Sequence, residues 1–193
     1  MLDAGTDFEF FNPYAKVKIG RANLPHWRQK SVLYFTTFRL ADSIPQEKIN
    51  LWRENYSQWL LRNPKPWNES QIEEFQIHFA RKIEYWLDKN HGTCILKNSK
   101  CKRIVEDCLR KFNGLRYQLD ALVVATNHVH VLVAPHEGNT LSAILKSWKG
   151  VSARKINQEL SREGTLWQKE TFDHIVRNES SLLRIRQYIQ AHK

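Results

Sequence analysis

The sequence has few cysteines and no long apolar run. Its three cysteines, Cys94, Cys101 and Cys108, are odd in number and spaced by seven residues, which matches neither a zinc motif nor a disulfide framework. We expect them to be reduced residues that pack in helices. No apolar run approaches the roughly 20 residues that cross a bilayer, and the first residues lack the basic and apolar regions of a secretory signal. These absences argue against a disulfide-rich secreted domain and a membrane protein, and they predict a cytoplasmic location.

Acidic residues are also in deficit. Thirty Lys and Arg stand against twenty Asp and Glu, which gives a formal net charge of +10 and favours a polyanionic partner, above all nucleic acid. No long Lys/Arg block or RGG-like tract concentrates this charge, so a basic protein without such a partner remains the alternative. Seven tryptophans offer stacking platforms for unpaired bases, although most aromatic residues should lie in the core.

The hydrophobic pattern changes its period along the chain, which locates strands and helices. Residues 1–30 have no clear periodicity and are expected to form an irregular arm. Alternation and β-branched residues predict strands over residues 31–41, 116–124, 128–135 and 171–177. Three- and four-residue spacing predicts helices that begin at Pro45, near Ser70, near Cys101, at Thr140 and at Asn178 or Ser180.

This order of elements predicts an α+β fold. Strand, helical crossover, strand, strand, helix, strand and helix is the order of a ferredoxin-like split βαβ antiparallel sheet with an added C-terminal helix. We expect a single domain over residues 1–193. Within it, residues 1–30 form the arm and residues 45–112 a helical insertion after the first strand.

Two histidines occupy the start of the third predicted strand. In this strand His128 and His130 share one face, while Val129, Val131 and Val133 share the other and should face the core. Imidazoles at positions i and i+2 of a strand can converge on one cation. The alternative is a pair of structural histidines with satisfied hydrogen bonds.

The last predicted helix carries a tyrosine and a histidine on one side. Leu182, Ile185 and Ile189 form its apolar arc, and Tyr188 and His192, four residues apart, lie side by side at the edge. If this arc packs on the sheet, both side chains can reach the histidine pair. The alternative is a tyrosine at the rim of the core and a frayed histidine.

These residues resemble a known family. Asn127-His128-Val129-His130 resembles the histidine-hydrophobe-histidine motif of HUH single-tyrosine nucleases, and Gln187-Tyr188-Ile189 resembles their tyrosine helix. The similarity is greatest to REP-associated tyrosine transposases, relatives of the insertion-sequence transposases that move single-stranded DNA. Further stretches that carry it are Leu24–Trp27, Tyr34–Pro45, Trp167-Gln168 and Phe172–Arg177.

The resemblance implies a HUH nuclease fold and strand-transfer chemistry. His128 and His130, with a third ligand, would hold one divalent metal, Mn²⁺ or Mg²⁺, on the scissile phosphate. Tyr188 would be the nucleophile, and the metal with nearby cations such as Arg184 would favour its phenolate. The expected products are a 5′-phosphotyrosine link and a free 3′-OH, which can rejoin strands by the reverse attack.

One position departs from the family pattern. Four residues after the tyrosine, the relatives usually carry Asn or Gln as the third metal ligand, whereas this chain has His192. A third imidazole shifts the preference from Mg²⁺ towards Mn²⁺ and later transition metals.

The substrate implied by the resemblance is DNA near REP-type hairpins, either single-stranded or with a short single-stranded flank. The resemblance also implies a monomer, with a dimer as the alternative, associated with the nucleoid. Two further readings stay open: a catalytically silent, domesticated DNA-hairpin-binding protein, and an unrelated metal-dependent hydrolase that activates water. Candidate DNA-binding residues are His26, Trp27, Lys146, Lys149, Arg154 and Arg184.

Overall fold

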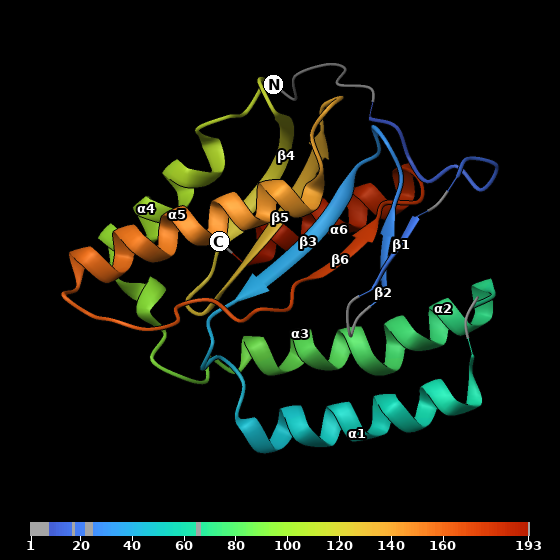
Figure 1. Ribbon diagram of the computed structural model, residues 1–193, viewed down its shortest axis with the longest axis horizontal. Helices are drawn as coiled ribbons and strands as arrows, with labels where there is room; N and C mark the ends of the chain where they lie inside the picture. The colour runs from blue at the N-terminus through green and yellow to red at the C-terminus, as the bar shows by residue number, and fades with distance from the viewer. Residues whose placement is uncertain (1–7, 17, 22–24, 65–66, 193) are drawn as a thin grey trace.

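Four antiparallel strands form one sheet, and helices cover both of its faces (Figure 1). The computed structural model describes residues 8–16, 18–21, 25–64 and 67–192. The strands of the sheet lie in the order β4-β5-β3-β6. In chain order they are β3 (Tyr34–Arg39), β4 (Tyr117–Val124), β5 (His128–Pro135) and β6 (Phe172–Ile175).

Two connections that each skip one position in the sheet define its topology. A helical crossover leads from β3 to β4, and β5 lies between these two strands, antiparallel to both. The helix α5 (Leu141–Glu159) leads from β5 to β6, and here β3 lies between. Each connection is a split βαβ unit. The predicted α+β fold with a ferredoxin-like antiparallel sheet is therefore confirmed.

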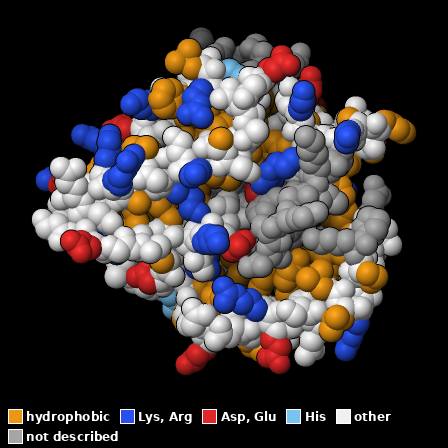
Figure 2. All heavy atoms as spheres, in the orientation of Figure 1, with side chains coloured by type: hydrophobic (Ala, Val, Ile, Leu, Met, Phe, Trp, Pro, Cys, Tyr) orange, Lys and Arg blue, Asp and Glu red, His pale blue; other side chains and the backbone are white. Residues whose placement is uncertain are grey.

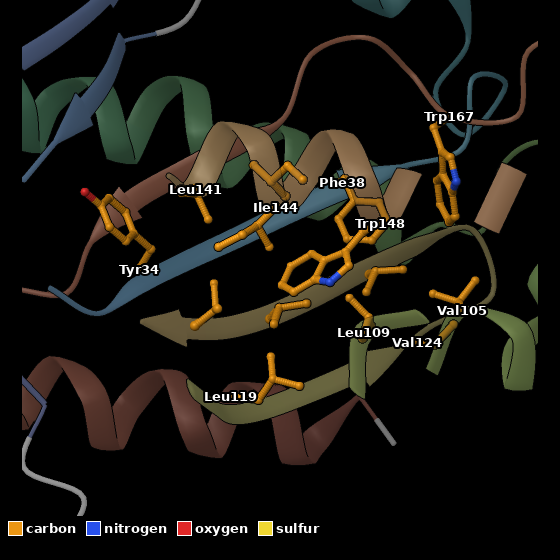
Figure 3. Packing of buried hydrophobic residues seen from close by; sticks show 14 of the residues in the cluster. Tyr34, Phe38, Val105, Leu109, Leu119, Val124, Leu141, Ile144, Trp148 and Trp167 are labelled. Atoms are coloured by element: carbon orange, nitrogen blue, oxygen red, sulfur yellow. The ribbon is translucent and has the colours of Figure 1, made fainter. Parts of the chain in front are cut away.

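The valine face of β5 forms the main core together with α5 and α4 (Ser99–Arg110). Val129, Val131 and Val133 are fully buried there, because alternate residues of a strand share a face and β-branched side chains pack well on a pleated surface. Trp148 of α5 points into this core, and its indole N–H donates to the hydroxyl of a buried tyrosine of β4 at 2.9 Å (Figure 3). The expectation that the valine row faces the core is confirmed.

The helices α4, α5 and α6 (Glu179–Ala191) begin at polar N-caps. The side chains of Asn98, Thr140 and Asn178 each accept a hydrogen bond from a backbone N–H of the first turn, which satisfies donors that the helix itself cannot pair. The start at Thr140 was predicted from the sequence, and of the two predicted caps of α6, Asn178 and Ser180, the structure has Asn178. Among the described residues, no helix combines the length and apolar character that crossing a bilayer requires.

The three cysteines are free, as predicted, and all are buried; the expectation that they pack in helices is wrong for Cys94. Cys101 and Cys108 lie on α4, where burial raises the pKa of both thiols. Cys94 instead precedes the short 3-10 helix η2 (Ile95–Lys97) and has a left-handed backbone with φ of 47°.

The crossover from β3 to β4 begins with a pair of antiparallel helical segments that have a core of their own. Aromatic side chains dominate this core, among them Trp52, Tyr56 and Phe79. Figure 1 shows the pair beside the sheet, next to β6. Its segments are α1 (Gln46–Arg62), α2 (Glu69–Phe75), η1 (Gln76–Ala80) and α3 (Arg81–Asp88).

A π-helical turn, η1, interrupts the single helix expected from Ser70 to Asp88. In such a turn the carbonyl groups leave the regular i to i−4 pattern. The indole N–H of Trp52 donates to the backbone carbonyl of Phe79 at 3.1 Å. A side chain of α1 thus donates a hydrogen bond to the irregular turn. The local sequence of residues 70–88 does not indicate that the helix contains such a turn.

The expectation of an irregular arm over residues 1–30 is wrong in part. Residues 18–21 and 25–28 form an antiparallel pair, β1 (Lys18–Arg21) and β2 (Pro25–Arg28). The guanidinium of Arg28 forms an ion pair with Asp173 of β6, which ties β2 to the edge of the sheet. Strands of four residues are too short to show a clear alternation of apolar and polar side chains. The pairing of β1 with β2 therefore depends on a contact with a distant segment, which the local sequence does not indicate.

Candidate active site

The face of β5 opposite the valine row carries the two histidines. His128 and His130 are 1% and 0% exposed, and their ring centroids lie 4.5 Å apart. Their Nε2 atoms face each other at 2.9 Å. The pairing of β5 with both β3 and β4 fixes this face, so the two imidazoles converge as the i, i+2 spacing predicts.

Hydrogen bonds hold the other ring nitrogens. Asn127 Oδ1, 2.8 Å from His128 Nδ1, can only accept, which places the proton on Nδ1 and leaves a lone pair on Nε2. The Thr37 hydroxyl, 2.7 Å from His130 Nδ1, can accept from this nitrogen or donate to it. Both outer nitrogens are therefore engaged, and both Nε2 atoms are directed to one point.

This arrangement suits a cation. At 2.9 Å, the Nε2–H of a neutral His130 can donate to the Nε2 lone pair of His128; with the His130 proton on Nδ1 instead, both Nε2 lone pairs are available to a metal ion. Burial lowers the pKa of His128 to about 4 and that of His130 well below its usual value, so both imidazoles are uncharged at neutral pH. Neutral imidazoles with a fixed tautomer are the form that binds divalent metals.

The helix α6 brings a phenol and a third imidazole to the same point. The Tyr188 hydroxyl lies 3.3 Å from His130 Nε2. The ligand atoms of His128, His130 and His192 all lie within 4.8 Å of one another. The four predicted residues are thus brought together, from a strand and a helix that lie far apart in the chain.

The packing of α6 explains this convergence. Leu182 and Ile189 are buried against the sheet, with Ile185 partly buried between them, and Figure 1 places α6 behind the sheet while α5 lies in front. The ion pair between Arg186 and Asp120 of β4 fixes the rotation of the helix. The predicted apolar arc therefore lies on the sheet and directs its neighbouring tyrosine to the histidines.

Phe35 of β3 packs against the rings of His130 and Tyr188. It stacks on His130 at 5.4 Å between centroids and meets Tyr188 edge-on at 6.2 Å. Such contacts add orientation to the area that they bury. These contacts therefore help to set the relative orientation of the phenol and the imidazole.

Two carboxylates of α3 lie close enough to act on the phenol. The pKa of Tyr188 is raised, first by burial and then by the negative charges of Glu84 and Asp88. Burial and Asp88 also raise the pKa of Glu84, to about 7. The surrounding charges therefore keep the phenol protonated, in contrast to the expected influence of Arg184, whose guanidinium is exposed and donates to the Ser181 hydroxyl.

A cavity of about 500 Å³ opens beside Tyr188, between η1 and α3 on one side and β6 and α6 on the other. Trp27 and Arg184, both predicted to bind DNA, line it. Its volume is in the range of ligand-binding clefts. The backbone of His26 lies in β2, but its side chain is outside the described part of the structure.

The other predicted DNA-binding residues lie on α5, on the opposite face of the sheet. Lys146 and Arg154 are exposed, and Figure 2 shows Lys and Arg side chains over this face. Lys149 is half-buried, and its Nζ donates to the Gln168 carbonyl at 2.6 Å. Burial lowers the pKa of Lys149 to about 8. The basic face of α5 is therefore separate from the cavity beside Tyr188.

His174 of β6 gives the fold a pH dependence that can be measured. Burial lowers its pKa from 6.5 to about 4, so its contribution to stability is complete above pH 6.5 and is lost as the pH falls towards 4. At about 1.4 kcal/mol per unit, this loss reaches at most about 3 kcal/mol. We expect His174→Gln, which cannot titrate, to lose less stability than the wild type between pH 7 and 4.5 in urea unfolding. Parallel curves for the two proteins would show that His174 does not contribute.

No role in the site was predicted for Thr37, Asn127, Glu84 or Asp88. Asn127 precedes the histidine pair directly, so its position in the motif is a signal that could have been used. The other three lie 91 to 40 residues before His128 in the chain. No spacing rule connects them to the histidines.

Comparison with known proteins gives a family match. The model of the family described as "Transposase IS200 like" matches residues 76–192, and no curated protein matches the chain. Among solved structures, one similar chain is a REP-associated tyrosine transposase bound to a REP hairpin, with 13% identity, a TM-score of 0.42, and coverage of 86% of this chain and 70% of that one. Another is a Deinococcus radiodurans R1 protein named as a transposase, with 15% identity, a TM-score of 0.40, and coverage of 96% and 98%.

Proposed function

This chain belongs to the IS200-like transposase family, and from that premise we propose that it is a metal-dependent, single-stranded DNA endonuclease and strand transferase. The match over residues 76–192 includes the histidine pair and the tyrosine helix, and it confirms the resemblance to transposases. Membership supports a role in DNA processing. The specific chemistry and the assignment of residues below are proposals.

One observation carries the proposal. A phenol oxygen lies 3.3 Å from the Nε2 atom of His130, and three imidazoles offer ligand atoms within 4.8 Å of one another. A nucleophile beside a candidate metal site is the arrangement that phosphodiester transesterification needs.

His128, His130 and His192 would hold the metal. When bound, a divalent cation supplies positive charge to the oxygens of the scissile phosphate. Asn127 and Thr37 fix the imidazole rings, as their hydrogen bonds to the two Nδ1 atoms indicate.

Tyr188 would carry out the attack. Its oxygen forms a bond to phosphorus, the bond from phosphorus to the 3′ oxygen breaks, and that oxygen takes a proton from water and leaves as a 3′-OH. The phenol loses its proton to water in the cavity. One phosphoester replaces another, so the reverse attack by a 3′-OH can join strands without a nucleotide cofactor.

The proposed substrate is DNA with a hairpin and a single-stranded flank, of the kind found at REP elements. The net charge of +10 and the cavity beside Tyr188 support a DNA partner. We propose that the protein acts as a monomer, since Tyr188 and the histidines of one chain already meet.

A covalent adduct tests the proposal. A hairpin oligonucleotide with a randomised single-stranded flank, labelled at its 3′ end, is incubated with the protein and Mn²⁺. We expect a labelled, SDS-resistant protein adduct, and from a 5′-labelled copy a shorter strand that a polymerase can extend. Binding without an adduct would favour a silent hairpin-binding protein. Cut strands with a free 5′ phosphate and no adduct would favour a hydrolase that activates water.

The choice of metal is a further prediction. Because His192 stands where relatives carry an amide, we expect faster adduct formation with Mn²⁺ than with Mg²⁺ at equal metal occupancy. His192→Gln, which restores an amide oxygen, should shift the preference towards Mg²⁺. Equal rates with the two metals in the wild type would count against His192 as a ligand.

A further inference from the structure

The C-terminal end of α3 reaches the candidate metal site through two separate contacts. Asp88, the last residue of α3, lies with its Oδ1 atom 3.1 Å from His192 Nε2. The Asn127 side-chain amide donates to the backbone carbonyls of Leu87, at 3.3 Å, and of His91, at 3.1 Å. The same helix end therefore contacts both the turn before His128 and the third imidazole.

His192 needs such a support. It is the C-cap of α6, a position at which helices commonly fray. Even so, its side chain is only 19% exposed. Its Nδ1 atom lies 2.8 Å from the Tyr188 carbonyl oxygen, and its Nε2 atom faces Asp88. Both neighbours are acceptors, so His192 must release one of them to offer a lone pair to a metal.

We propose that Asp88 is a positioning residue for His192, an inference that rests on the proposed function. Asp88 would continue to accept from the Nε2–H of His192, and Nδ1, now 2.8 Å from the Tyr188 carbonyl oxygen, would be the atom that offers its lone pair to the metal. A carboxylate that accepts from the outer nitrogen of a metal-binding histidine fixes its tautomer and its orientation and raises its basicity.

The link through Asn127 extends this role to a second ligand. Asn127 Oδ1 accepts from His128 Nδ1, and its amide group is held by the carbonyls at the end of α3. The helices between β3 and β4 thus orient two of the three imidazoles. This gives the helical insertion a function at the metal site in addition to its own aromatic core.

Stability alone does not explain the contact between Asp88 and His192. The Asp88 side chain is 42% exposed, and partly exposed ion pairs contribute little to folding. In addition, a carboxylate in the last turn of a helix opposes the helix dipole. Asp88→Ala should therefore fold normally, which makes it a clean test of orientation.

The test is a Mn²⁺ titration of the full chain, followed by electron paramagnetic resonance. We expect Asp88→Ala to weaken Mn²⁺ binding by about 10- to 100-fold, as other losses of such partners do. Asp107→Ala is the matched control, because Asp107 is an exposed carboxylate in the last turn of α4. We expect it to bind Mn²⁺ as the wild type does. In a His192→Ala background, Asp88→Ala should change the affinity less than about twofold, since Asp88 acts through His192.

Each other outcome has a distinct meaning. An unchanged affinity in Asp88→Ala overturns the inference, and a tighter one does too, because Asp88 would then compete with the metal for Nε2. An equal loss in the His192→Ala background also overturns it. If the wild-type protein forms the DNA adduct while the Asp88 variants give any of these results, the proposed function stands and only the positioning role of Asp88 is rejected. A wild-type protein that binds no Mn²⁺ overturns the proposed function itself.

Discussion

Tyr188→Phe is expected to abolish the covalent DNA adduct and to lower strand cleavage by at least about 1,000-fold. The substitution removes one oxygen, the atom that lies 3.3 Å from His130 Nε2. The ring remains, with its edge-on contact to Phe35 and its contact to His192 at 4.3 Å between centroids. The variant should therefore fold, bind DNA and bind Mn²⁺ as the wild type does.

Tyr85→Phe provides the matched control. Tyr85 lies on α3 and is 58% exposed, and we expect its variant to form the adduct at the wild-type rate. Adduct and cleavage are measured on the same 3′-labelled hairpin, and Mn²⁺ binding on the same preparations. Cleavage that persists in Tyr188→Phe would remove the phenol from the mechanism and favour water as the nucleophile.

The fold was predictable where local pattern and long-range packing agree. The alternation of valine and histidine on β5 specifies which face meets the core, and a shift of one residue would bury the wrong set. The caps at Thr140 and Asn178 were predictable because N-capping depends on a few adjacent residues. By contrast, β1 and β2 depend on an ion pair with Asp173, and the π turn at η1 depends on Trp52. Neither partner can be inferred from the local sequence.

The candidate site divides in the same way. The spacing of His128 and His130 on a strand, and of Tyr188 and His192 on a helix, follows from the geometry of one element. The meeting of strand and helix follows from the apolar arc of α6. The acidic surroundings of the phenol were not predictable, because Glu84 and Asp88 belong to α3, and three of the four strands of the sheet (β4, β5 and β6) lie between α3 and α6 in the chain.

Those acidic surroundings make the reaction depend on the metal. Burial, Glu84 and Asp88 all raise the pKa of Tyr188, so the protein alone disfavours the phenolate that must attack. Only an added positive charge at the histidines reverses this balance. We therefore expect no adduct in the presence of a chelator at neutral pH, even at high protein concentration.

His128→Ala is expected to remove that charge by preventing metal binding. The imidazole is 1% exposed and offers Nε2 at 2.9 Å from its partner. Without it we expect Mn²⁺ affinity to fall by at least about 100-fold and adduct formation to become undetectable.

Thermal unfolding gives a second readout. At a Mn²⁺ concentration of about 100 times Kd, one site adds about 2.7 kcal/mol to the free energy of unfolding. The wild-type Tm should then rise by about 5 to 10 °C, and that of the variant should not change.

His78→Ala separates the loss of a ligand from the loss of any histidine. His78 is exposed on η1, and its variant should keep both the Mn²⁺-dependent rise in Tm and the adduct. Loss of folding stability is a second way in which His128→Ala can lose the adduct, because the substitution leaves a cavity and deprives Asn127 Oδ1 of its donor. The Tm without metal decides between these causes. If His128→Ala unfolds near the wild-type Tm in the presence of a chelator and still shows the full rise with Mn²⁺, the imidazoles of β5 are not the metal ligands. The 2.9 Å contact between the two Nε2 atoms would then be a structural hydrogen bond between neutral imidazoles.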